Sequence, residues 1–152
     1  MPTTSSRFNK GITASLNISS TLSTYNKAKK MFNKVGMVIE LKKEQEMDTF
    51  TGLIGSGPAY FFYLLKAYEK RLIKLCNNDS ALTAKAMSGL LEGVALSLED
   101  GSSIDDLIKK VASKKGTTEA GLKSFKKNKL LSSFDKGISA AVNRSKEIAN
   151  ES

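Results

Sequence analysis

A chain of 152 residues is long enough for one ordinary domain with a substantial core, or for a small domain with an additional segment. It contains 40% apolar and 26% charged residues, which is globular rather than disordered or fibrous, and it has no histidine, which excludes histidine-dependent triads and most zinc sites. The net charge of +9 comes mainly from lysines without aromatic residues between them, so it gives only weak support for nucleic-acid binding.

The first 42 residues predict a strand, a helix and a second strand. Residues 11–16 alternate Ile12, Ala14 and Leu16 with polar residues, which predicts a strand with one buried face. Residues 22–35 have an apolar stripe at helical spacing, and 37–41 read MVIEL, a run of strand formers. Two strands and one helix leave ladder groups unpaired and an apolar face uncovered, so this segment is typical of the end of a larger α/β domain.

Only helical patterns follow from residue 43 onward. After Gly101, Ser103 and Asp106 have the spacing of a capping box, with aspartate in place of the usual glutamate. The predicted helices cover residues 43–53, 58–76, 81–99, a short segment from Ser103 to 111, a segment from about Thr117, and about 130–149. The fold class is therefore mainly α, with residues 1–42 as the end of an α/β domain and 43–152 as an all-helical domain.

The stretch from Thr49 to Leu65 has no charged residue and contains the internal Pro58. A kinked, buried helical junction explains it, with residues 50–54 either ending a helix or forming a short strand. The strand alternative would imitate a dinucleotide-binding loop, but the third glycine of that motif is Tyr60 here and no suitable acidic residue follows. The Gly-Ser-Gly-Pro break also argues against a membrane span.

The helix predicted over residues 81–99 is apolar nearly all round. Between residues 84 and 98 its only charged residues are Lys85 and Glu92. Such a helix must be buried on nearly every side, and a chain with few helices can hardly surround one of its own. We therefore expect a homodimer, possibly a higher oligomer, in which a second copy supplies the missing cover.

A single cysteine, Cys76, cannot form an internal disulfide, and no export signal is visible at the amino terminus. Both features favour a cytoplasmic protein, with Cys76 packed as a small apolar residue.

The charged residues are unevenly distributed along the chain. Residues 1–43 hold eight basic and one acidic residue, residues 44–108 hold five basic and ten acidic, and residues 109–152 hold eleven basic and four acidic. The basic ends are expected to attract anions.

Residues 113–118, SKKGTT, are the best site candidate that composition and spacing provide. Hydroxyl groups, free amides at a helix start and neighbouring lysines would together bind an anion. The alternative is that Thr117 merely caps the following helix and the lysines form a solvated face.

Three segments together resemble pyrroline-5-carboxylate reductase: DTFTGLIGSGPAY at 48–60, VASKKGTTEAGL at 111–122 and AAVNRSKE at 140–147. The resemblance covers nearly the whole chain. It implies an enzyme of proline biosynthesis that reduces 1-pyrroline-5-carboxylate to L-proline with NADPH or NADH. It also implies an amino-terminal Rossmann domain for the cofactor and a helical domain, of the 6-phosphogluconate-dehydrogenase C-terminal-like type, that interlocks with a second copy.

The resemblance also assigns roles to individual residues. Thr51 falls where the family has a threonine proposed to hydrogen-bond or protonate the imine nitrogen, and it is the candidate catalytic residue. Met1 to Thr4 resemble the stretch near the nicotinamide, which makes Thr3 and Thr4 candidate cofactor-binding residues. The substrate carboxylate is expected to be bound by the loop residues Ser113, Gly116, Thr117 and Thr118.

The sequence departs from the family in ways that bear on activity. It begins where the family's cofactor domain is nearly finished, so we expect this chain alone neither to bind NADP or NAD nor to turn over. In the substrate loop, Lys114 and Lys115 replace Pro-Gly and Glu119 adds a negative charge; Thr3 replaces an asparagine. The alternatives are half of a split enzyme completed by a separate Rossmann-domain chain, a non-catalytic dimeric scaffold and, less favoured, a basic nucleic-acid-binding protein.

Overall fold

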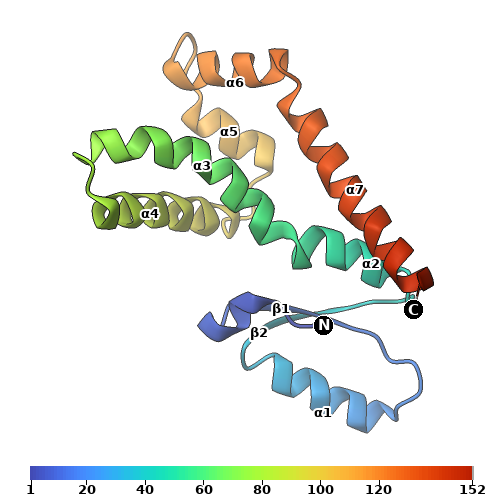
Figure 1. The fold of residues 1–152 in the computed structure, drawn as a ribbon. Helices are drawn as coiled ribbons and strands as arrows, with labels where there is room; N and C mark the ends of the chain where they lie inside the picture. Colours follow the sequence, from blue (N-terminus) through green and yellow to red (C-terminus); the bar gives the residue numbers. More distant parts are fainter. Residues whose placement is uncertain (152) are drawn as a thin grey trace. The chain divides into compact units, whose positions relative to one another are not determined.

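The computed structural model describes residues 1–151, and Figure 1 shows the order of their elements along the chain. Two compact units are present: residues 1–60 with the described part of 135–152 form the first, and residues 61–134 form the second. The predicted division between residues 42 and 43 concerns family domains rather than packing, so it stays a prediction.

In the first unit, strands β1 (Gly11–Ser15) and β2 (Gly36–Glu40) pair in parallel, with Gly11 opposite Gly36. Helix α1 (Leu22–Phe32) connects them and contacts β2, and the 3-10 helix η1 (Thr4–Phe8) precedes β1. The predicted strand, helix and strand are thus confirmed. The mainly helical fold class is confirmed as well, because only helical elements follow β2 in the described residues.

The burial of β1 differs from the predicted single buried face. Thr13 and Ala14 are both 2% exposed, although neighbouring residues of a strand point to opposite faces. The amino terminus explains part of this burial: Pro2 bridges to Thr13 in antiparallel fashion, and the Met1 ammonium donates a hydrogen bond to the Ala14 carbonyl at 2.8 Å. Strand β1 therefore has β2 on one edge and the chain start on the other, and both of its faces are covered.

The uncharged stretch forms a helical junction and contains no strand. Helix α2 (Glu46–Phe50) passes directly into the π-helix η2 (Thr51–Gly55), and α3 (Gly57–Leu75) follows after Ser56. The strand alternative, and with it the imitation of a dinucleotide loop, is wrong because residues 50–54 are helical. Pro58 lies in the first turn of α3, where its missing N–H costs no helical hydrogen bond.

The second unit consists of helices with little internal cover. It contains most of α3 together with α4 (Ser80–Leu98), α5 (Ile104–Val111), α6 (Thr117–Lys127) and the start of α7 (Leu130–Glu151). Thr83 is the only buried residue of α4, although this helix is long and apolar enough by length and composition to cross a membrane. Cys76 is buried, as predicted. Phe61 of α3 and Phe134 of α7 place their ring centroids 6.3 Å apart.

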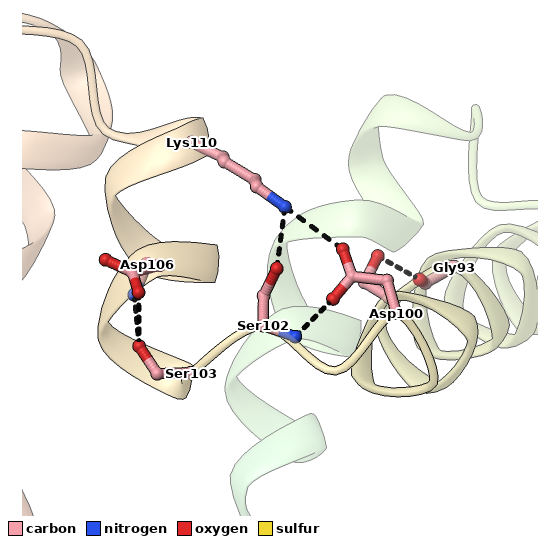
Figure 2. Close-up of polar contacts among 7 residues, drawn as sticks. Gly93, Asp100, Ser102, Ser103, Asp106 and Lys110 are labelled. Carbon is pink, nitrogen blue, oxygen red and sulfur yellow. Dashed lines mark hydrogen bonds and ion pairs between the residues drawn. The ribbon is translucent and has the colours of Figure 1, made fainter.

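The corner between α4 and α5 is held by polar contacts (Figure 2). Asp100 accepts hydrogen bonds from the Ser102 amide at 2.7 Å and from the Lys110 ammonium at 3.0 Å. These contacts lower the pKa of the Asp100 carboxyl to about 2, with the Ser102 backbone as the main cause. Ser103 caps α5 by accepting from the Asp106 amide, as predicted, but the Asp106 carboxylate accepts from the Ser103 hydroxyl and not from its backbone amide as in a capping box.

Candidate functional site

The loop predicted to bind a carboxylate connects α5 to α6 in the second unit. The N-cap of α6 is Gly116, whose amide donates to the Ser113 carbonyl at 3.0 Å. A Cβ at position 116 would lie 2.3 Å from the Ser113 hydroxyl oxygen, so only glycine lets this hydroxyl lie against the helix start. Thr117 is the first helical residue and not the cap, so the capping alternative is wrong in its detail.

The carboxylate of Glu119 is hydrogen-bonded to this loop. Its carboxylate accepts from the Lys115 backbone amide and pairs with the Lys123 ammonium at 2.7 Å. These two partners, Lys123 first, lower the pKa of the Glu119 carboxyl below its ordinary value. A carboxylate of the chain itself is therefore bound where the loop turns toward α6, beside the amides of the first helical turn, which have no acceptor inside the helix.

Lys115 adopts a left-handed backbone conformation with φ of 60°. A residue with a Cβ pays for this conformation, whereas glycine adopts it freely. The resemblance implies glycine at position 115, so the replacement of this glycine by Lys115 introduces backbone strain into the loop. Ser113 and Thr117 are exposed, while Gly116 and Thr118 are half-buried.

The candidate catalytic residue, Thr51, begins the π-helix η2 in the first unit. Its hydroxyl donates to the Met47 carbonyl at 2.8 Å, and its oxygen lies 3.7 Å from the Met1 sulfur. The Ser56 amide donates to the Thr51 carbonyl at 2.9 Å, which is the wide i to i+5 bond of a π turn. Such turns are frequent at functional sites. Met1 thus brings the start of the chain to the turn that carries Thr51.

The two candidate cofactor-binding residues differ in what they contact. The Thr3 hydroxyl accepts from the Ile12 amide at 3.0 Å and lies 2.9 Å from the Ser5 hydroxyl, so it holds η1 to the start of β1. Thr4 is exposed at the first position of η1. The structure therefore brings Thr51 and the Met1–Thr4 segment into one unit, and it places the carboxylate loop in the other.

Sequence reasoning missed the contacts that hold the Thr51 turn. Gly52 lies against helix α7, where an added Cβ would be 2.5 Å from a methyl carbon of Val142. Ser145 of α7 donates to the Asp48 carboxylate at 2.8 Å, and Tyr60 donates to the Gly52 carbonyl at 2.9 Å. Two of these residues, Val142 and Ser145, belong to the AAVNRSKE segment, which resembles the family but to which the resemblance assigned no role.

The described residues do not fit a dinucleotide by themselves. Dinucleotide-binding folds place glycines in the turn between a strand and the following helix, so that the backbone can approach the pyrophosphate. Here the connection from β1 to α1 reads LNISST and contains no glycine. The described sheet also has only two strands. We therefore derive no step through a nicotinamide cofactor from these residues.

Comparison with known proteins supports the fold and the family. The family model for pyrroline-5-carboxylate reductase dimerisation matches residues 44–148. The chain is 32% identical over 124 residues to pyrroline-5-carboxylate reductase of Pseudomonas aeruginosa, covering 82% of this chain and 45% of that protein. It is 35% identical over 109 residues to pyrroline-5-carboxylate reductase 1 of Bacillus subtilis, covering 72% of this chain and 37% of that protein.

Solved structures agree. A pyrroline-5-carboxylate reductase from Coxiella burnetii superimposes with a TM-score of 0.81 at 32% identity, covering 97% of this chain and 55% of that one. The Plasmodium falciparum pyrroline carboxylate reductase, solved with NADP bound, gives a TM-score of 0.84 at 25% identity, covering 97% and 60%.

The match over residues 44–148 makes this part of the chain a domain of the pyrroline-5-carboxylate reductase dimerisation type. The chain belongs to the pyrroline-5-carboxylate reductase family, and it spans less than half the length of these curated relatives.

Proposed function

We propose that this chain supplies the dimerisation and substrate-binding part of a pyrroline-5-carboxylate reductase, an NAD(P)H-dependent enzyme that makes L-proline. The observation that carries the proposal is the match of residues 44–148 to the family's dimerisation domain. The exposed state of the apolar helix α4 agrees with it, because this surface needs cover that the single chain does not supply.

The proposed partner is a second copy of the chain. Helices α4 and α5 line an apolar groove of about 710 Å³, which includes Leu90, Val94 and Ile108. Gly89 and Gly93 on the same part of α4 have no atom within 4 Å of an added Cβ, so a helix of the second copy could approach closely there. Burial between two copies also explains why α4 is apolar enough to resemble a membrane span. The free, buried Cys76 fits the proposed cytoplasmic location, where cysteines stay reduced.

The dimer is tested by replacing Leu90 with aspartate. Wild-type chain should sediment at twice the 16.5 kDa of one copy, and Leu90→Asp should sediment as a monomer because a charge in an apolar interface costs several kcal/mol. The matched control is Leu22→Asp at the exposed start of α1, which should remain dimeric. A wild-type chain that stays monomeric at tens of micromolar contradicts the proposal.

Each unit contributes one proposed element: in the second, the Ser113–Thr118 loop is a carboxylate-binding loop, and in the first, Thr51 is the residue that contacts an imine nitrogen. The Thr51 hydroxyl has one proton, and in this structure the Met47 carbonyl accepts it. The Thr51 oxygen is then left as an acceptor, which fits the N–H of a protonated imine. A proton donated by Thr51 would require the hydroxyl to turn away from Met47.

We propose that the 152 residues alone do not catalyse the reduction, because they do not fit a dinucleotide. The assay follows NAD(P)H oxidation with 1-pyrroline-5-carboxylate, first with this chain and then with a separately supplied cofactor-binding domain of the family. Turnover by the chain alone contradicts this part of the proposal. Turnover only in the mixture supports a reductase completed by a second polypeptide.

A non-catalytic dimeric scaffold is the second candidate. The lack of fit to a dinucleotide and the Glu119 carboxylate bound at the loop both favour it. Calorimetric titration of the chain with L-proline distinguishes the substrate-binding part of a reductase from a scaffold. A saturable heat of binding requires a loop that binds the carboxylate, whereas a scaffold should show no saturable heat.

A further inference from the structure

Helix α7 touches the helical segment that carries Thr51 on both sides of this residue. Three positions before Thr51, the Asp48 carboxylate accepts a hydrogen bond from the Ser145 hydroxyl at 2.8 Å. One position after it, Gly52 is buried against Val142, with no room for a Cβ. The two α7 residues are three apart, so they lie on the same face of their helix.

The turn that begins at Thr51 and closes at Ser56 has the rarer π geometry. A π turn has one more residue than an α-helical turn, and its rarity reflects an energetic cost that neighbouring contacts must offset. Here the Ser56 amide closes the turn on the Thr51 carbonyl, and the Tyr60 hydroxyl donates to the next carbonyl, that of Gly52. If α7 moved away, the segment could relax toward an ordinary α-helix, which would rotate Thr51.

We propose that Val142 and Ser145 are positioning residues, which hold the π turn in register and thereby set where the Thr51 hydroxyl lies. This inference rests on the proposed function, because the position of Thr51 matters to chemistry only if Thr51 contacts substrate. It assigns a role to the AAVNRSKE segment, which is part of neither the Ser113–Thr118 loop nor the apolar groove between α4 and α5.

The first measurement needs no turnover. In the 152-residue chain, Ser145→Ala should accelerate hydrogen exchange of the Ser56 amide about fivefold, on the scale of one lost net hydrogen bond, and shift the NMR signal of the Thr51 methyl group. Ser139→Ala is the matched control, because Ser139 is exposed on the same helix, and it should change neither signal. Asp48→Asn, in a chain that keeps Ser145, retains an acceptor oxygen for the Ser145 hydroxyl and should keep most of the wild-type protection.

The second measurement uses the chain assembled with the cofactor-binding domain. Ser145→Ala should lower kcat about tenfold, because small displacements of a reacting group are costly, and leave KM within about twofold, because the carboxylate loop is unchanged. Ser145→Thr keeps the hydroxyl donor and should recover much of kcat. A general loss of folding would instead reduce the active fraction in Ser145→Ala and Ser145→Thr alike.

Two results overturn the inference: unchanged Ser56 exchange and Thr51 methyl signal in Ser145→Ala, or altered exchange with unchanged kcat. A wild-type assembly without turnover counts against the proposed function and not against the positioning. In that case the exchange and methyl data alone decide whether α7 holds the turn.

Discussion

In the unit of residues 1–60 and 135–151, the turn bearing Thr51 is held by Ser145, which lies 97 positions from its partner Asp48. In the unit of residues 61–134, the carboxylate loop is held by neighbours such as Glu119, only four positions from Lys115. The first site therefore depends on tertiary packing within one chain. The second forms locally, while the helices of the same unit expose apolar side chains that we propose a second copy covers.

The largest expected effect tests the long-range contact. Gly52→Ala should lower the free energy of unfolding by about 2 kcal/mol, because its methyl group would overlap both the side chain and the backbone of Val142. Urea denaturation monitored by circular dichroism measures it. Gly137→Ala on α7 is the control: nothing lies within 4 Å of its added Cβ, so it should stabilise the protein slightly. Equal effects of the two substitutions would show that α7 does not pack on the turn.

The next effect is local and has the opposite sign. Lys115→Gly should raise the free energy of unfolding by about 0.5–1 kcal/mol, because glycine adopts the left-handed conformation at this position without strain. Lys114→Gly next to it lacks positive φ and should destabilise by a similar amount. If both substitutions destabilise, the loop does not hold Lys115 in the described conformation.

Acid should loosen the second unit at the corner between α4 and α5. The folded pKa of Asp100 is lowered to about 2 from an ordinary 3.8, so its stabilising contribution is present above pH 3.8 and is lost as pH falls toward 2. The protection factor of the Ser102 amide, which compares its exchange with that of an unstructured chain at the same pH, should therefore fall over this pH interval in the wild type. Asp100→Ala, which removes both acceptor oxygens, should show low protection of this amide already at neutral pH and no further loss in the interval.

The smallest effect concerns the charge at the loop. Glu119→Gln should strengthen binding of L-proline about two- to fivefold, since a negative charge beside the proposed carboxylate site is removed from a half-buried position. Glu147→Gln, on an exposed ion pair of α7, should leave binding unchanged. Isothermal titration at low ionic strength measures both, and weaker binding by Glu119→Gln would mean that Glu119 organises the loop rather than competing with the ligand.

The amino-acid sequence by itself determined the secondary-structure elements and led to the expectation of a partner. The helix cap at Ser103, the helix start at Gly57 and Pro58, and the all-round apolar face of α4 depend on residues close together in the chain, so their local chemistry predicts them. The resemblance in three short segments likewise named the family and the candidate residues before any geometry was known.

Only the tertiary structure decided how those residues are held. The π turn at Thr51, the absence of space at Gly52 and the Ser145–Asp48 hydrogen bond all arise where α7 returns to the first unit. Periodicity does not report which distant helix meets which turn, and helical propensity cannot distinguish a π turn from an α turn when packing supplies the difference. The burial of Thr13 has the same cause, because the chain start covers an edge that the alternation within β1 does not reveal.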